Sequence, residues 1–140
     1  MGRRRSAREL ALRLLFEVDV GKAPLEQVWE VSVERERYDA STMEFARRLL
    51  EGTIAHCREI DKLISQYAKE WSLERMANVD RNILRLATFE ILYEQDIPVS
   101  VSVDEAVELA KKYSTAESGK FVNGILGGML RHLDEHAQGE

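Results

Sequence analysis

Cysteine is almost absent from the 140-residue chain, because Cys57 is the only one. A single cysteine excludes an internal disulfide and a cluster of thiolate zinc ligands, and it is typical of a reducing compartment. Long hydrophobic runs are absent too, since a charged residue interrupts every apolar stretch before about 18 residues, and no apolar signal-peptide core follows the start. We therefore predict a cytoplasmic protein without a membrane-spanning segment.

Proline and glycine are scarce, with two and eight residues, whereas 44% of the chain is hydrophobic. A chain of this composition can bury enough apolar surface to offset the entropy lost on folding, which excludes a disordered or fibrous protein. Its length suits one modest core. We predict a single domain over residues 1–140.

The net charge of −5 is unevenly distributed. Residues 1–13 contain five arginines and one glutamate, so this segment carries +4 and the rest of the chain −9. A polyanionic partner must therefore bind at a local basic site, while the acidic remainder favours a basic protein partner.

The first half of the chain has apolar residues at the three- and four-residue spacing of amphipathic helices. A capping box of Ser6 and Glu9 predicts a helix that stops at Gly21, which leaves residues 1–5 as a basic arm before it. Pro24 opens a shorter second helix. A second capping box, Ser41 with Glu44, predicts one long helix to Tyr67, bent near Gly52.

The second half continues the helical pattern. Asn78 is a good cap for a helix over 79–93, whose apolar residues cover nearly the whole circumference, as in a helix buried inside a bundle. Residues 99–103 alternate like a strand, but no other run could pair with them, and Ser102 with Glu105 forms a third capping box. The last helix carries an apolar stripe over 121–133.

Three glycines, Gly124, Gly127 and Gly128, lie in this last helix, where each costs roughly 1 kcal/mol relative to alanine. We predict that Gly124 and Gly128, four residues apart, allow another helix to approach closely. The predicted fold is all-α, with six or seven helices.

No constellation of residues predicts catalysis. Residues 132–136 match the H-x-x-E-H pattern of one group of zinc peptidases, but a catalytic zinc needs rigidly held ligands, and this run lies where helices fray. No close pair of carboxylates stands in an apolar context. We expect no enzyme, no metal and no cofactor.

The basic start of the chain is the remaining functional signal. Arginine binds phosphates through several planar donors and can stack on bases, so the group Arg3, Arg4, Arg5 and Arg8 predicts contact with a nucleic acid. Short basic termini also serve as solubility tails, and the composition leaves both interpretations open. The later helices lack the basic face that a helix-turn-helix DNA reader needs.

Three segments together carry a resemblance to a known family: residues 3–11, residues 79–90, and residues 103–113 running on to Lys-Phe-Val-Asn-Gly at 120–124. They resemble the NusB family of bacterial transcription antitermination factors, in order and over nearly the whole chain. The resemblance implies two small packed helical bundles and a factor that catalyses no reaction.

The resemblance also implies partners. Members of that family bind the single-stranded boxA element of ribosomal RNA transcripts together with NusE, a ribosomal protein, and join transcribing RNA polymerase with other Nus factors. The sequence leaves homodimerisation open.

Carried over to matching positions, the resemblance implies two sets of site residues. The expected RNA-binding residues are Arg3, Arg4, Arg5, Arg8, Glu117, Ser118, Lys120 and Phe121. Those expected to bind NusE are Phe16 and Asp80. For Phe121, base stacking and a place in the core both stay open. Phe16 stands where some relatives have tyrosine, so no hydroxyl hydrogen bond is implied there.

Two other functions remain open from the sequence. A helical protein-interaction scaffold without an RNA role would show the same capped, amphipathic helices. The same module also occurs as an accessory RNA-binding domain of ribosomal RNA methyltransferases, although no methyltransferase domain follows here.

Overall fold

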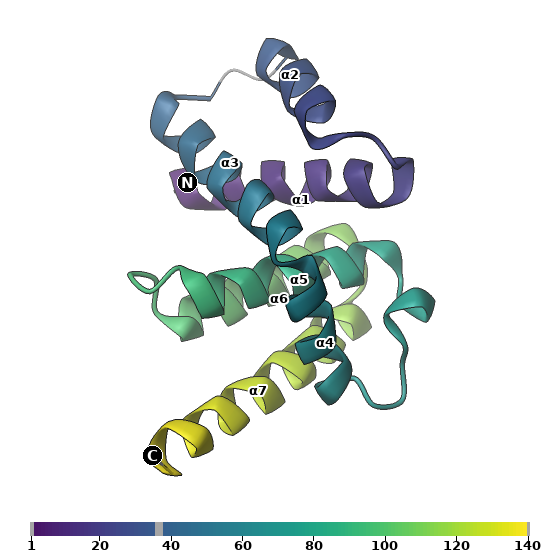
Figure 1. Ribbon diagram of the computed structural model, residues 1–140, viewed down its shortest axis with the longest axis vertical. Coiled ribbons are helices and arrows are strands. Elements are labelled where there is room, and N and C mark those ends of the chain that lie inside the picture. Colours follow the sequence, from purple (N-terminus) through teal and green to yellow (C-terminus); the bar gives the residue numbers. More distant parts are fainter. Residues whose placement is uncertain (1, 36–37, 140) are drawn as a thin grey trace. The chain divides into compact units, whose positions relative to one another are not determined.

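The computed structural model describes residues 2–35 and 38–139, with backbone alone at 34–35 and 134–139 (Figure 1). Every regular element in the described residues is helical, which confirms the predicted all-α fold. The elements are α1 (Arg3–Gly21), α2 (Leu25–Arg35), α3 (Ala40–Ala55), α4 (Cys57–Tyr67), the 3₁₀ turn η1 (Leu73–Arg75), α5 (Asn78–Tyr93), α6 (Val99–Tyr113) and α7 (Ala116–Gly139).

The chain divides into two compact units, unit 1 up to Ala55 and unit 2 from His56. The prediction that residues 1–140 form one domain stays a prediction. None of the described helices is long and apolar enough to cross a membrane.

Unit 1 is built on the packing of α1 against α3, and α2 contacts α1 at an angle to it (Figure 1). The predicted stripes form its core, since Leu10 and Leu14 of α1 and Leu49 and Leu50 of α3 are all buried. As predicted, α1 ends at Gly21, and Lys22 then adopts a left-handed φ of 56°, which reverses the chain toward α2.

The predicted caps of α1 and α3 are both wrong. Helix α1 begins at Arg3, without a side-chain cap, so Ser6 is not its cap and the arginines at 3–5 form its first turn rather than an arm. Arginine is a good helix former, and no residue between Arg3 and Ser6 prevents the helix from starting at Arg3. The cap before α3 is Asp39, whose Oδ1 accepts a hydrogen bond from the backbone N–H of Thr42 at 2.8 Å, and not Ser41.

The predicted long helix from Ser41 to Tyr67 is interrupted. The interruption falls at His56, between α3 and α4, and Gly52 lies within α3. Glycine costs helix stability but does not by itself end a helix whose neighbours are buried, and Leu49 and Leu50 are fully buried.

Unit 2 surrounds α5, which packs against α4, α6 and α7, as its apolar circumference predicts (Figure 1). Helix α6 begins at Val99, so the helical interpretation of the alternating valines is correct. Ser102 is not its cap, however. Its side chain is buried and its hydroxyl donates to Oε1 of the buried Glu90 on α5, at 3.1 Å.

The glycines of α7 differ in what surrounds them. A Cβ added at Gly128 would lie 3.5 Å from Cδ1 of Tyr67, which is ordinary contact, while one at Gly124 would meet no atom of the described residues within 4 Å. The expected close approach at Gly124 is therefore wrong. The tightest glycine is one that the sequence analysis missed, Gly119, where a Cβ would lie 3.1 Å from Cγ of Lys111.

We predict that Gly124→Ala stabilises the protein by about 0.5 to 1 kcal/mol, because Gly124 is exposed in a helix interior and alanine has the higher helix propensity. Chemical denaturation of both proteins measures the difference. A loss of stability would show that the backbone at Gly124 has a close neighbour.

Candidate RNA and partner interfaces

The start of α1 and the start of α3 together line a pocket of about 340 Å³ in unit 1, which we call the Phe45 pocket. It is lined by Arg3, Arg4, Ser41, Thr42, Glu44, Phe45 and Arg48. Because residues 41, 45 and 48 share one face of α3, this helix presents a hydroxyl, an aromatic ring and a cation to the same side.

Positive charges converge on the ring of Phe45. The guanidinium carbons of Arg4 and Arg48 lie 5.3 and 5.1 Å from its centroid, and that of Arg8 lies 5.7 Å away. These distances permit cation–π attraction, which holds the planar groups in place. Like charges gathered this closely repel one another, so a bound anion would relieve the repulsion.

Arg3 is held at the rim of the pocket by Asp39, through an ion pair of 3.1 Å between exposed side chains. The hydrogen bond from the Thr42 backbone N–H holds the pKa of Asp39 below its ordinary value of 3.8, and the charge of Arg3 adds to the shift. Asp39 therefore stays ionised and orients Arg3, although an exposed pair of this kind is weak enough to exchange Asp39 for a phosphate.

The four arginines predicted to bind RNA are not equivalent. Arg3 and Arg4 are exposed and line the Phe45 pocket, Arg5 is half-buried outside that lining, and Arg8 is only 3% exposed. The burial of Arg8 favours a packing role beneath Phe45 over a contact with phosphate.

Arg48 is the residue that the sequence analysis missed. It stands in α3, 40 residues after Arg8, so the charge run at the start of the chain does not include it. The signal that could have found it is its spacing of three residues from Phe45, which places both side chains on one helical face.

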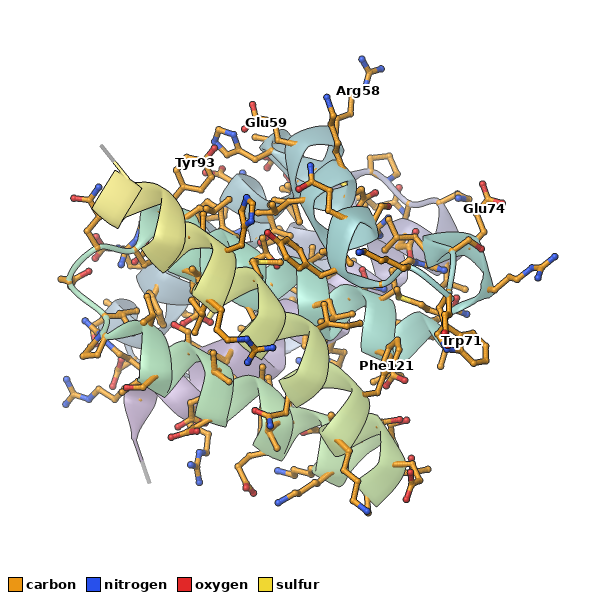
Figure 2. All side chains as sticks on the ribbon, turned by 90° about the horizontal axis from the view of Figure 1, so that it is seen from below. Arg58, Glu59, Trp71, Glu74, Tyr93 and Phe121 are labelled. Carbon is orange, nitrogen blue, oxygen red and sulfur yellow. The ribbon has the colours of Figure 1, made fainter. Side chains whose placement is uncertain are left out.

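A second pocket, of about 210 Å³, lies in unit 2, and we call it the Trp71 pocket. Trp71 and Phe121, which lie on the same side of the molecule in Figure 2, both line it. Its lining consists of Trp71, Arg75, Met76, Ala77, Asp80, Glu117, Ser118 and Phe121. A hydrogen bond from Arg81 to the carbonyl of Leu73, at 3.0 Å, ties η1 to the start of α5, and a second one, to Oδ1 of Asn78 at 2.7 Å, lies within α5.

A chain of hydroxyl groups positions Asp80 in this pocket. Thr115 caps α7, since its Oγ1 accepts from the backbone N–H of Ser118 at 3.0 Å and its hydroxyl donates to Oγ of Ser118 at 3.1 Å. The Ser118 hydroxyl in turn donates to Oδ2 of Asp80 at 3.0 Å. Because Ser118 has one hydroxyl proton, the 2.8 Å contact between Ser114 and Ser118 must have Ser114 as its donor.

Three of the four residues at the start of α7 that were predicted to bind RNA lie in one pocket. Glu117, Ser118 and Phe121 line the Trp71 pocket, whereas Lys120 lies outside its lining and pairs with Glu117 at 3.6 Å, both side chains being exposed. Phe121 is half-buried and lines the pocket. Part of its ring is packed inside the protein and part is accessible, so a packing role and base stacking are compatible. Ser118 is buried and uses its hydroxyl on Asp80.

The two residues predicted to bind a protein partner occupy different environments. Phe16 is 37% exposed and lines a shallow groove of about 390 Å³ in unit 1, the Phe16 groove, with Val20 and Val31 also exposed. Asp80 is only 7% exposed. A side chain that is this buried has little surface to offer a protein partner, and its surroundings give it a place in the Trp71 pocket instead.

The fold and these sites define an all-helical protein with a basic aromatic pocket, an acidic aromatic pocket and an apolar groove. Comparison with known proteins places it more closely. The profile of the NusB family matches residues 5–131, so the chain belongs to the NusB family.

Curated relatives agree. The chain is 51% identical to the transcription antitermination protein NusB of Desulforamulus reducens, over 96% of this chain and 94% of that protein. It is 49% identical to the NusB of Symbiobacterium thermophilum, over 93% and 90% of the two chains. The prediction of a transcription antitermination factor that is not an enzyme is thereby confirmed.

Solved structures share the fold. NusB of T. maritima superposes with a TM-score of 0.84 at 45% identity, covering 94% of this chain and 92% of that chain. The factor NusB solved with NusE and double-stranded RNA superposes with a TM-score of 0.85 at 29% identity, covering 94% and 98%.

We predict that Asp39→Asn lowers the melting temperature at neutral pH, because asparagine keeps the cap of α3 but loses the attraction to Arg3 and to the helix N-terminus. The folded-state pKa of Asp39 is lowered, so the stability due to its charge is present above pH 3.8 and is lost as the pH falls through the lowered value. Melting curves of both proteins should therefore converge below pH 3.8. A difference that is constant with pH would assign it to the cap alone.

Proposed function

We propose that this protein suppresses transcription termination by binding a single-stranded, boxA-like RNA together with the ribosomal protein NusE, and that it thereby joins cytoplasmic RNA polymerase with other Nus factors. In this mechanism the protein catalyses no reaction but binds the RNA and NusE at the same time. The family relationship and the neighbouring complex of NusB with NusE and RNA support this assignment.

The observation that carries the RNA-binding proposal is the convergence of Arg4 and Arg48 on Phe45, with Arg3 at the rim. An RNA backbone supplies the anions that such a cluster attracts, and arginine contacts phosphates through several donors at once. We assign the phosphate contacts to these three arginines, with Arg5 beside them, and we leave Arg8 to the core of unit 1. A helical scaffold without an RNA role does not need this convergence.

The neighbouring residue Arg47 provides a matched control for Arg48. Its guanidinium lies 5.2 Å from the centroid of Trp29 and pairs with Glu26 and Glu51, whose hydrogen bonds raise its pKa above the ordinary value. It is absent from the lining of the Phe45 pocket. Replacing either arginine changes the net charge equally, but only Arg48 belongs to the proposed site.

We predict that Arg48→Gln weakens binding to single-stranded RNA about fivefold and reduces the salt dependence of the binding constant by about 0.7 logarithmic unit, the value for one phosphate contact. Arg47→Gln should change neither by a comparable amount. Titrations of labelled RNA at several salt concentrations, with melting curves of each variant, measure both quantities. Equal effects of the two substitutions would refute a specific phosphate site at the Phe45 pocket.

The Phe16 groove is the surface that we assign to NusE. Exposed apolar side chains that line one groove are typical of a protein interface, and an aromatic anchor contributes more than its neighbours. The net charge of −9 outside the first 13 residues adds long-range attraction for a basic ribosomal protein.

We predict that Phe16→Ala weakens binding of NusE at least about fivefold, because it removes the anchor of the groove. Val33→Ala provides the control, since Val33 is a comparably exposed apolar residue of unit 1 outside the lining of the groove. Calorimetric titration with purified NusE measures both affinities. If Val33→Ala weakened binding as much as Phe16→Ala, the interface would have to be assigned to the face of α2.

A further inference from the structure

We infer that the Trp71 pocket binds one nucleobase of the RNA and selects a base with an exocyclic amino group, which donates a hydrogen bond to Oδ1 of Asp80. The inference rests on the proposed RNA-binding function and goes beyond it, because it assigns a base preference to a named atom.

Oδ1 of Asp80 is a buried acceptor without a hydrogen bond from any described residue. The other carboxylate oxygen, Oδ2, accepts from Ser118. A buried acceptor that lacks a partner costs free energy, and native proteins contain few of them. A ligand that brings a donor to this atom removes that cost, so the pocket favours ligands with an N–H group directed at Asp80.

The aromatic residues of the pocket suit a flat ring. Trp71 is 52% exposed and Phe121 is half-buried, and both line the pocket (Figure 2). Nucleobases stack on aromatic side chains with little regard to sequence, which supplies affinity but no selectivity. Since Oδ1 is covered by its neighbours, an entering base must displace a lining side chain, and Trp71 is exposed.

The charges of the pocket favour a base over the cationic side chain of a protein partner. Asp80 and Glu117 would attract a lysine or arginine, but Arg75 lines the same pocket and Lys120 pairs with Glu117 at its edge. These cations repel a basic side chain. They attract the phosphates on either side of a neutral base, so a nucleotide satisfies both signs of charge.

The hydroxyl chain makes Asp80 an acceptor only. The single proton of Ser118 is committed to Oδ2, so the carboxylate has no donor to offer a carbonyl group. Adenine and cytosine present amino groups on their pairing edges, whereas uracil presents two carbonyl oxygens on either side of its one N–H. A carboxylate therefore accepts from the amino bases and repels the oxygens of uracil.

The test compares the full-length protein with its Asp80→Asn variant. Each is titrated with a single-stranded adenosine dodecamer and with the same dodecamer built from purine riboside, which lacks only the amino group. Wild-type protein should bind the adenosine strand at least about tenfold more tightly. In Asp80→Asn the Ser118 hydroxyl keeps the amide oxygen at the position of Oδ2, so the amide nitrogen faces the pocket and the preference should vanish.

Glu74→Gln is the matched control, because Glu74 is exposed, lies in η1 beside the pocket without lining it, and loses the same charge (Figure 2). It should keep the wild-type preference for adenosine. Trp71→Ala should weaken binding of both strands by a similar factor, since stacking does not depend on the amino group. Melting curves of all variants confirm that they are folded.

Each other outcome is decisive. Equal binding of the two strands by wild-type protein overturns the base preference and leaves the proposed function in place. An unchanged preference in Asp80→Asn, with weakened binding of NusE, assigns the pocket to a protein side chain and overturns the inference. Failure of wild-type protein to bind the adenosine strand overturns the inference alone, because the proposed function requires binding of boxA-like RNA together with NusE and not of an adenosine strand.

Discussion

The constraint on which unit 2 depends is the burial of the middle of α5, where the polar residues Asn82, Thr88 and Glu90 are all buried. Packing against three other helices leaves these buried side chains no access to water, so each of them needs a partner inside the protein. Glu90 accepts from Ser102 of α6, and the Thr88 hydroxyl lies 4.0 Å from the sulfur of Met129 on α7. These pairs fix the positions of α6 and α7 around α5 more specifically than apolar contacts alone, because a hydrogen bond tolerates little displacement.

At Asp80 only one of the two carboxylate oxygens has a partner inside the protein. Ser118 satisfies Oδ2 and in doing so joins the first turn of α5 to the first turn of α7, which creates the Trp71 pocket. The second oxygen stays without a partner among the described residues. Ser32 Oγ and Thr53 Oγ1 of unit 1 also lack partners, but among the described residues of unit 2 the unpaired buried side-chain atom is Oδ1 of Asp80. An unpaired polar group beside a pocket is typical of a site whose partner comes from outside.

Much of this fold could be predicted from the sequence, and the failures have a common cause. Apolar periodicity reports which face of a helix is buried, so it predicted the helices and the central place of α5. It says little about helix ends. A serine followed by a glutamate three residues later occurs within helices as well as before them, and Ser6, Ser41 and Ser102 all lie inside their helices. Asp39, a single residue with no such partner, is the real cap of α3.

Some of the site residues could likewise be predicted from the sequence, and others could not. The cluster of arginines at the start could be seen as a charge run. The spacing of Arg48 from Phe45 places both on one face of α3, but that this face meets Arg4 depends on how α1 packs against α3, which the sequence pattern does not give. The burial of Asp80 could have been predicted, because it stands in a helix that is apolar nearly all round. Its unpaired oxygen could not, since that depends on a serine 38 residues away.

On the proposed function, both pockets gain stability from what a nucleotide carries. In the Phe45 pocket guanidinium groups repel one another around a single ring, and in the Trp71 pocket a carboxylate oxygen lacks a donor. A phosphate lowers the first cost and an amino group on a base lowers the second. The first contact is independent of sequence and strongly dependent on salt, while the second depends on the base and only weakly on salt. One polymer thus supplies both groups, and the division of affinity and selectivity between two units of the chain follows from the chemistry of each pocket.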